Sequence, residues 1–492
     1  MWLLLILLGF LTYFMLKHSV AKITRTPIWL FWLVLMAPAF IWTTWFVVYG
    51  EKKPVPVLLL LAPFILCPLV CRWLIEAGKP NPEAKEVVSE TEPNKLVATA
   101  KAKEEPGTIR PITASEEKSL RDCFPWDIYF LQQLSYHPQA IFCLGKLRAA
   151  PDTAYQTIQK NVEKVFGDRF LVFLQEDLHD QPFFALVSNP WEKSRSPDEN
   201  EQITRPFLAL GLLLLTLVTT TLVGAQMSGV TEQDLEANLS VLQQGLPYSL
   251  GIIAILGIHE LSHYLAALHY KIRTTLPYFI PVPFFLGTFG AYIQMRSPVP
   301  HRKALFDVAI AGPLGGFVIT IILLFWGLSL SEVVPLAEKS SLLDFQALDP
   351  RYSFLFAVCS KIALGSVLVA GKALSLHPLA IAGYLGLLVT ALNLMPVGQL
   401  DGGHIVHAMF GQRTAMIIGQ LMRLFVLVLA FIRPEFLLFA IFLLLMAASD
   451  RPALNNVTEL DDGRDFLGLL SLALLAAILL PLPGAIATWW NF

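Results

Sequence analysis

The sequence predicts a polytopic α-helical membrane protein with a small α+β domain inserted between its spans. Of its 492 residues, 55% are hydrophobic and only 15% are Asp, Glu, Lys or Arg, and the mean hydropathy is +0.58. This composition is typical of a chain that is solvated mostly by lipid. The net charge of −2 comes without a cluster of Lys and Arg, so nothing in the sequence indicates a nucleic-acid partner.

Apolar stretches that approach the roughly 20 residues needed to cross a bilayer recur along the chain. The segment 354–375 is apolar too, but Lys361 and Lys372 flank a weak core, so we expect it to lie in the interface. The first stretch lacks a basic leader and a cleavage site, so we expect a retained span. The predicted spans are 2–16, 28–49, 55–75, 206–225, 247–268, 304–329, 378–395, 414–432, 435–448 and 464–489.

Changes in composition divide the chain into five predicted parts. These are N-terminal transmembrane segments (1–78), a polar linker rich in Pro, Glu, Lys and Thr (79–118), a small soluble α+β domain (119–203), a membrane core (204–450), and a C-terminal loop with a transmembrane helix (451–492). The sequence of the soluble part predicts strands and a helix in the order β-β-α-β-β, with Asp152 as the N-cap of the amphipathic helix. It holds no group of residues that indicates chemistry, so a regulatory or docking role is favoured.

Basic residues predict the orientation in the membrane. The loop 226–246 contains acidic residues and no Lys or Arg. By the positive-inside rule that loop faces outward, whereas 269–303 and the α+β domain face the cytoplasm or stroma. The basic residues of 269–303 are Lys271, Arg273, Arg296, Arg302 and Lys303.

The run "GIIAILGIHELSHYLAAL" (251–268) places three polar side chains inside a predicted span. His259 and His263 are four residues apart, so on a helix both imidazoles can reach one ion, with Zn–N distances of about 2.0–2.1 Å. Glu260 points to one side of that pair, where it can contact a water without binding the metal. This HExxH pattern is the metalloprotease signature. Because ionisable groups in mid-membrane are costly, three of them within five residues indicate a functional site.

A catalytic zinc ion usually takes three protein ligands, so a third is expected elsewhere. Within or beside apolar segments the acidic candidates are Asp307, Asp401, Glu435 and Asp450. Glu435 and Asp450 resemble ordinary helix-end charges, and Asp307 has Arg302 and Lys303 nearby, which favours a local ion pair.

Asp401 is the expected third ligand because it lies in "ALNLMPVGQLDGGHIVHAMF" (391–410), where Pro and Gly break a helix at membrane depth. Irregular backbone is tolerated there only inside protein or beside a wet cavity. His404 and His407 are rival ligands, although packing on the next helix is favoured for both. Asn393 can satisfy the broken backbone or donate to an oxyanion.

The pairing of "HELSH" (259–263) with "NLMPVGQLDGGH" (393–404) resembles the site-2 protease family of intramembrane zinc metalloproteases. The segment 277–316 looks like that of the plant-plastid and cyanobacterial branch. The resemblance implies a site-2-protease-like core, one zinc ion per chain held by His259, His263 and Asp401, Glu260 as general base and Asn393 in support. It also implies that 287–293 is a membrane-embedded edge strand or re-entrant hairpin. One departure is "GKLR" (145–148), where that branch has GNLR.

The resulting hypothesis is regulated intramembrane proteolysis of transmembrane protein substrates by a multi-pass protein of a cyanobacterial plasma or thylakoid membrane, or of a plastid membrane. Glu260 would activate a zinc-bound water for attack on the peptide carbonyl. Two alternatives are a catalytically inactive relative that acts as a membrane scaffold or chaperone, and a metal-binding transporter. The transporter would move metal across vesicles, whereas the protease needs one tightly held zinc ion and a substrate.

Overall fold

The computed structural model describes the ranges 27–49, 112–137, 140–177, 181–189, 205–283, 286–336, 344–432, 436–447 and 450–490, with seven single residues between 9 and 74. The predicted span 2–16, most of 55–75, Glu435 and most of the predicted linker lie outside these residues. Helix α2 (Ile28–Tyr49) coincides with the span predicted at 28–49 and belongs to a unit of its own, residues 1–91.

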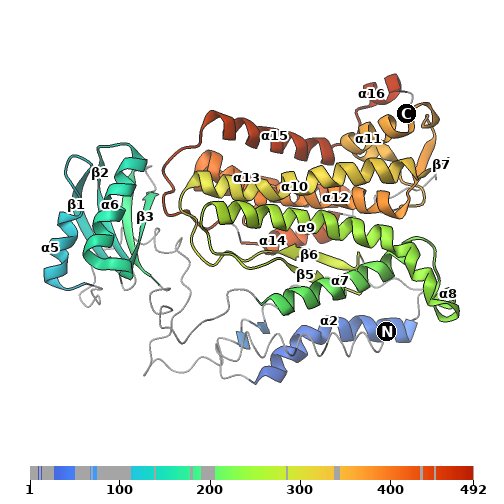
Figure 1. Cartoon of the computed structure of the whole chain (residues 1–492), viewed down its shortest axis with the longest axis horizontal. Helices are drawn as coiled ribbons and strands as arrows, with labels where there is room; N and C mark the ends of the chain where they lie inside the picture. The colour runs from blue at the N-terminus through green and yellow to red at the C-terminus, as the bar shows by residue number, and fades with distance from the viewer. Residues whose placement is uncertain are drawn as a thin grey trace. The chain divides into compact units, whose positions relative to one another are not determined.

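The α+β domain has the predicted order of strands and helix (Figure 1). Its four strands form one antiparallel sheet in the order β1-β2-β4-β3, so β1 and β3 lie at the edges. The inner face of the sheet packs with α6 in a core that includes Tyr129, Ile158 and Phe184. Its elements are α5 (Ala114–Asp122), β1 (Tyr129–His137), β2 (Ala140–Leu147), α6 (Pro151–Phe166), a 3-10 turn (Gly167–Arg169), β3 (Phe170–Glu176) and β4 (Pro182–Ser188).

Two boundaries of this domain differ from the sequence prediction. Helix α5 begins inside the predicted linker, because Thr113 and Glu116 form a reciprocal capping box that starts a helix there. The prediction of Asp152 as an N-cap is wrong: α6 begins at Pro151 after Ala150, which makes no side-chain capping bond. The fixed φ of proline suits the first helical position, and Asp152 is left to bond elsewhere.

The "GKLR" sequence has a clear structural account at its first and last residues. Gly145 lies on β2 beside the β1 bulge, where a Cβ atom would overlap the carbonyl oxygen of Phe130. Lys146 is exposed, and the Arg148 guanidinium lies 5.1 Å from the ring centre of Phe130. The glycine is therefore a packing requirement, whereas the second position faces solvent.

We expect Gly145→Ala to destabilise the α+β domain by about 1–3 kcal/mol, because an added methyl group forces the two strands apart. Hydrogen exchange of the β1 and β2 amides in the full chain would measure the loss. Lys146→Ala on the same strand is the matched control and should leave the protection unchanged. Equal protection in both variants would contradict this account of Gly145.

Outside the α+β domain, the described residues are mostly apolar helices, α2 among them, and the chain is a polytopic helical membrane protein. Among the described residues, five helices have the length and hydropathy to cross a bilayer, and a bent pair makes a sixth candidate. The helices are α7 (Pro206–Met227), α8 (Glu232–Ala237), a 3-10 stretch (Leu239–Gly245), α9 (Leu246–His269), α10 (Arg302–Ser329), α11 (Phe354–Leu364), α12 (Pro378–Leu394), α13 (Asp401–Ile432), α14 (Leu437–Leu445), α15 (Asp462–Leu479) and α16 (Gly484–Trp490).

Several predicted spans are corrected by the structure. The stretch 464–489 is two helices, α15 and α16, bent by 70°. The stretch 414–432 is the second half of α13, which has a non-helical residue at Gly411 (φ 82°). The prediction at 378–395 is confirmed by α12, which ends one residue earlier, whereas the helix at 435–448 is shorter than predicted, with 9 residues in α14.

The segment 354–375 is not one helix, since α11 ends at a 3-10 turn (Gly365–Val367) and strand β8 (Lys372–Ser375) follows. Strand β8 pairs with β7 (Glu332–Pro335) in a two-stranded sheet that the sequence analysis did not anticipate.

Helices α9, α10 and α12 pack against one another and form the centre of the membrane part, with α13 against α10 (Figure 1). Their shared core contains large buried side chains such as Phe306 and Tyr384. Strands β5 (Tyr278–Pro281) and β6 (Thr288–Tyr292) form an antiparallel hairpin in contact with α7 and α9. This hairpin occupies the segment for which an edge strand is expected.

Candidate metal centre

Helix α9 carries two histidines whose rings face each other in the interior of the membrane part. His259 and His263 lie one turn apart and are 4% and 7% exposed. Their Nε2 atoms are 3.1 Å apart. The helix forms because the segment is apolar and has Pro247 in its first turn. Within this helix, the i, i+4 spacing alone brings the two rings together.

Asp401 reaches the same point from a different part of the chain. Helix α12 ends at Leu394, six residues without helical conformation follow, and Asp401 begins α13. The turn is close-packed, since a Cβ atom at Gly402 would overlap the carbonyl of Leu394 and one at Gly403 would overlap that of Gly398. These two glycines therefore allow the first turn of α13 to fold back onto the end of α12.

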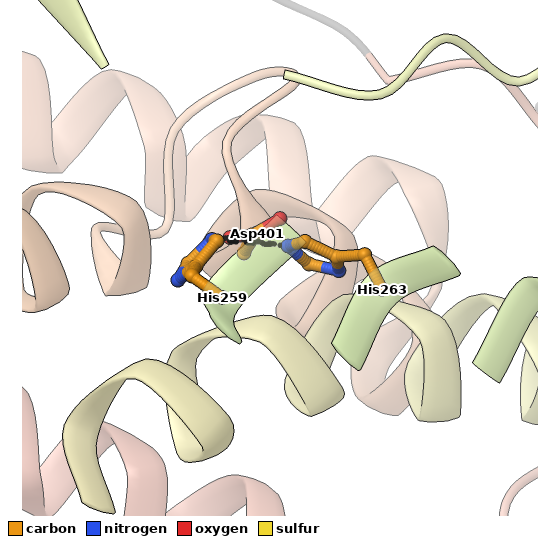
Figure 2. A group of neighbouring side chains, drawn as sticks. All are labelled: His259, His263 and Asp401. Carbon is orange, nitrogen blue, oxygen red and sulfur yellow. Dashed lines mark hydrogen bonds and ion pairs between the residues drawn. The ribbon is translucent and has the colours of Figure 1, made fainter. Parts of the chain in front are cut away.

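The three side chains converge as the sequence predicted (Figure 2). The Asp401 Oδ2 atom lies 3.4 Å from His259 Nε2 and 3.3 Å from His263 Nε2. Ligands bound tetrahedrally at 2.0–2.1 Å from a zinc ion are themselves about 3.3 Å apart. The three measured separations of 3.1, 3.3 and 3.4 Å therefore match the edges of a zinc tetrahedron.

The hydrogen bonding of His263 also fits a metal. Its Nδ1 atom lies 2.7 Å from the carbonyl oxygen of Val308, which can only accept, so Nδ1 carries a proton, and in the neutral ring Nε2 then presents a lone pair. That lone pair points at another imidazole nitrogen and at a carboxylate oxygen. Such a cluster of electron donors is stabilised by a cation between them.

Two predicted residues border this centre. Glu260 is 7% exposed, and its carboxylate lies near the backbone N–H of Ile293, the residue after β6. Asn393 places Nδ2 3.3 Å from His259 Nε2. The site thus combines three ligand atoms, a further carboxylate beside the hairpin and an amide within reach of the same point.

A glycine face on α10 makes room for the two histidine rings. A Cβ atom at Gly312 would overlap His263 Nε2, and one at Gly316 would lie 3.1 Å from His259 Nδ1. A Cβ atom at Gly315 would overlap the Ser262 hydroxyl on the turn between them. The sequence analysis did not single out these glycines, although their spacing of three and four residues is that of one helical face.

The structure settles the environment of the rival acids. Asp307 forms an ion pair with Arg464 (2.6 Å) instead of the expected Arg302 or Lys303, and it accepts a hydrogen bond from the Tyr270 hydroxyl. The reading of Asp450 as an ordinary helix-end charge is wrong. Its side chain is 5% exposed and lies 2.7 Å from a ring nitrogen of both His404 and His407. Those two histidines therefore pack against Asp450.

Comparison with known proteins places these features in a family. Residues 247–432 match the model of peptidase family M50, and residues 118–194 match that of the EGY3 middle domain. The first match contains the whole metal centre, and the second contains the α+β domain. No solved structure matches this chain.

Curated relatives extend the likeness over most of the chain. The probable zinc metalloprotease EGY2, chloroplastic, of Arabidopsis thaliana is 32% identical over 74% of this chain and 64% of its own length. The probable zinc metalloprotease EGY1, chloroplastic, of the same plant is 30% identical over 70% of this chain and 66% of its own length. The chain thus spans slightly less than two thirds of the length of these relatives. It belongs to peptidase family M50, the site-2 protease family, in the branch of the plant chloroplastic metalloproteases.

Proposed function

We propose that this chain is an intramembrane zinc metalloprotease that holds one zinc ion and hydrolyses peptide bonds of membrane-spanning substrates. The observation that carries the proposal is the convergence of His259, His263 and Asp401 at tetrahedral spacing, with Glu260 beside them. The names of the relatives as probable zinc metalloproteases support it. In this proposal the three converging side chains are the zinc ligands.

A zinc ion held there would supply Lewis-acid polarisation of the scissile carbonyl and make an attacking water more acidic. Glu260 has the position of the general base: it takes a proton from that water and returns it to the leaving amine. Its carboxylate lies near the Ile293 backbone, on the side of the hairpin. Asn393, next to His259, is placed to donate its amide to the oxygen on which negative charge develops.

Strand β6 is the proposed seat of the substrate. In the described residues its sheet has two strands, with β5 on one side. The other edge can take an extended peptide as a third strand. The carboxylate of Glu260 meets the backbone at the end of β6, so a peptide in this position passes close to the base. A membrane-spanning helix must unwind to bind here, because its own hydrogen bonds shield its carbonyls.

We further propose that the hairpin is embedded in the membrane and that the α+β domain lies on the cytoplasmic or stromal side, as the basic residues indicate. The relatives are named chloroplastic. A thylakoid or plasma membrane of a cyanobacterium, or a plastid membrane, is the matching location. The substrate is a transmembrane protein.

Removal of the metal tests the proposal. Purified chain, reconstituted in liposomes with single-span test proteins, should cleave at least one of them within the span and contain one zinc per chain by elemental analysis. A zinc chelator should stop cleavage, and one equivalent of Zn²⁺ should restore it. Cleavage by zinc-free protein would contradict the proposal.

The same preparation separates the two alternative functions. A catalytically inactive scaffold would bind zinc and a membrane-spanning protein but leave the protein intact over the full substrate panel. A transporter would carry Zn²⁺ into sealed liposomes, which an internal fluorescent indicator detects. We expect cleavage without zinc uptake.

A further inference from the structure

A segment outside the membrane helices connects the metal centre to the α+β domain. This segment, residues 450–458, is called here the strap. It lies between helices α14 and α15 in sequence. Its first residue, Asp450, contacts α13, and its later residues contact β3, so its two ends meet different parts of the fold.

On the domain side the strap pairs with the edge of the sheet. Strand β3 is an edge strand, and Leu174 donates its N–H to the Leu454 carbonyl at 2.7 Å, while Asn456 donates to the Leu174 carbonyl at 3.0 Å. The Gln175 amide donates to the Ala453 carbonyl at 2.8 Å. The strap therefore pairs with β3 through a parallel bridge at Leu174 and occupies part of an edge that is otherwise open in the sheet.

A side chain of α6 closes the same junction. The Asp152 carboxylate accepts hydrogen bonds from Asn455 Nδ2 at 3.2 Å and from the Thr458 hydroxyl at 2.8 Å. Asp152, which was predicted to cap α6, therefore bonds to the strap instead. Leu454 and Val457 pack on the apolar core of the domain.

On the membrane side the strap is tied to α10 and α13. Leu454 and Asn455 donate their N–H groups to the carbonyls of Val299 and Pro300, just before α10. The His407 ring bonds to Asp450 Oδ2 at 2.7 Å and to Asn456 Oδ1 at 2.9 Å. His404, one turn earlier on α13, lies 2.7 Å from the same carboxylate oxygen.

The carboxylate of Asp450 thus contacts two successive turns of the helix that Asp401 begins: it forms a hydrogen bond with His407 and lies in ion-pair contact with His404. Burial by itself raises the pKa of the Asp450 carboxyl, but the neighbouring His404 and His407 outweigh burial and hold this pKa well below its usual range. The group therefore stays ionised and keeps its hold on both rings. Asp401 lies three residues before His404, so the contact fixes the turn that presents the ligand oxygen.

We propose that Asp450 is a positioning residue for the metal ligand Asp401: it clamps the first turns of α13 through His404 and His407, and the strap joins this clamp to the α+β domain. This inference rests on the proposed zinc site. It assigns the domain a physical role, because docking of the domain on the strap sets how firmly the third ligand is held. Partners that bond directly to a metal ligand typically contribute about 10- to 100-fold to metal affinity, and Asp450 acts one contact further away, so its contribution should lie at or below the lower end of that range.

The test measures zinc affinity, by competition with a chromogenic chelator, and the visible spectrum of the Co²⁺-substituted full chain, which reports ligand geometry without any turnover. Asp450→Asn should weaken zinc binding by up to about 10-fold and change the Co²⁺ spectrum. Asp450→Glu, which restores the charge, should recover part of both. Asp152→Ala, on the domain itself, should shift affinity in the same direction by a smaller factor.

Asp349→Asn is the matched control, since Asp349 is also a buried acid, with a side-chain exposure of 12%, but pairs with Arg351. It should leave zinc affinity and the spectrum unchanged. If Asp450→Asn lowers thermal stability yet binds zinc with wild-type affinity and spectrum, Asp450 is only structural and the inference is overturned. Wild-type chain that binds no zinc would instead overturn the proposed function, and with it this inference.

Discussion

We expect the Glu260→Gln variant to cleave membrane-spanning substrates about 10³-fold more slowly than the wild type, or not measurably, while it retains its zinc. A general base contributes about 10²- to 10⁴-fold to a hydrolytic rate. The amide keeps the shape of the side chain but cannot accept the proton of the attacking water. In the proposed site the ligand atoms come from His259, His263 and Asp401, so zinc binding should not need the charge of residue 260.

Two measurements on the same preparation test this prediction. Elemental analysis should find one zinc per chain in both proteins, and the rate of cleavage should differ between them. Gln294, a polar residue one position beyond the Glu260 partner Ile293, offers a control: Gln294→Ala should cleave at a rate close to wild type. If Glu260→Gln turned over at the wild-type rate, another group would have to be the base.

Much of the candidate metal centre could be predicted, because two of its residues are close in sequence and because ionisable side chains within a membrane are energetically costly. The spacing of His259 and His263 fixes their proximity on any helix. Asp401 is one of few acids in the apolar part of the chain, and it follows residues that interrupt a helix. Each of these signals is readable in one sequence, since placing such groups in a membrane has a cost that a structural role rarely offsets.

Partners across the fold could not be predicted in the same way. Asp450 resembled an ordinary helix-end charge, because nothing near it in sequence indicates that two histidines of α13 surround it. Asp307 pairs with Arg464, which lies 157 positions away. A carboxylate in a sequence shows its charge but not the element that packs against it, so local neighbours such as Arg302 were wrong guesses.

Helix boundaries failed for a related reason. Hydropathy indicates that a segment avoids water, but apolar residues serve buried strands and bent helices equally well. The 354–375 segment therefore contains α11 and β8, and 464–489 is bent between α15 and α16. The glycine face of α10 was not predicted either, since the role of a glycine in packing can be assigned only when the side chain opposite it is known.

That glycine face leads to the second large effect. Gly312→Ala should weaken zinc binding by more than about 100-fold, beyond the range for loss of a supporting contact, because the new methyl group would overlap the His263 ring at Nε2. Alanine is favoured over glycine inside a helix by about 1 kcal/mol, so helix propensity alone predicts that the substitution makes α10 more stable. Zinc affinity and thermal stability of the full chain should therefore move independently, with binding lost even if α10 is not destabilised.

A graded series separates occlusion from general damage. A Cβ atom at Gly316 would lie 3.1 Å from His259 Nδ1, and one at Gly257, on α9 itself, would have its nearest neighbour at 3.6 Å. The loss of zinc affinity should thus be largest for Gly312→Ala, smaller for Gly316→Ala and negligible for Gly257→Ala. The order follows from distance to the ligand rings, since all three replacements are the same chemical change inside a membrane helix. Wild-type affinity in Gly312→Ala would mean that His263 does not hold the metal through Nε2.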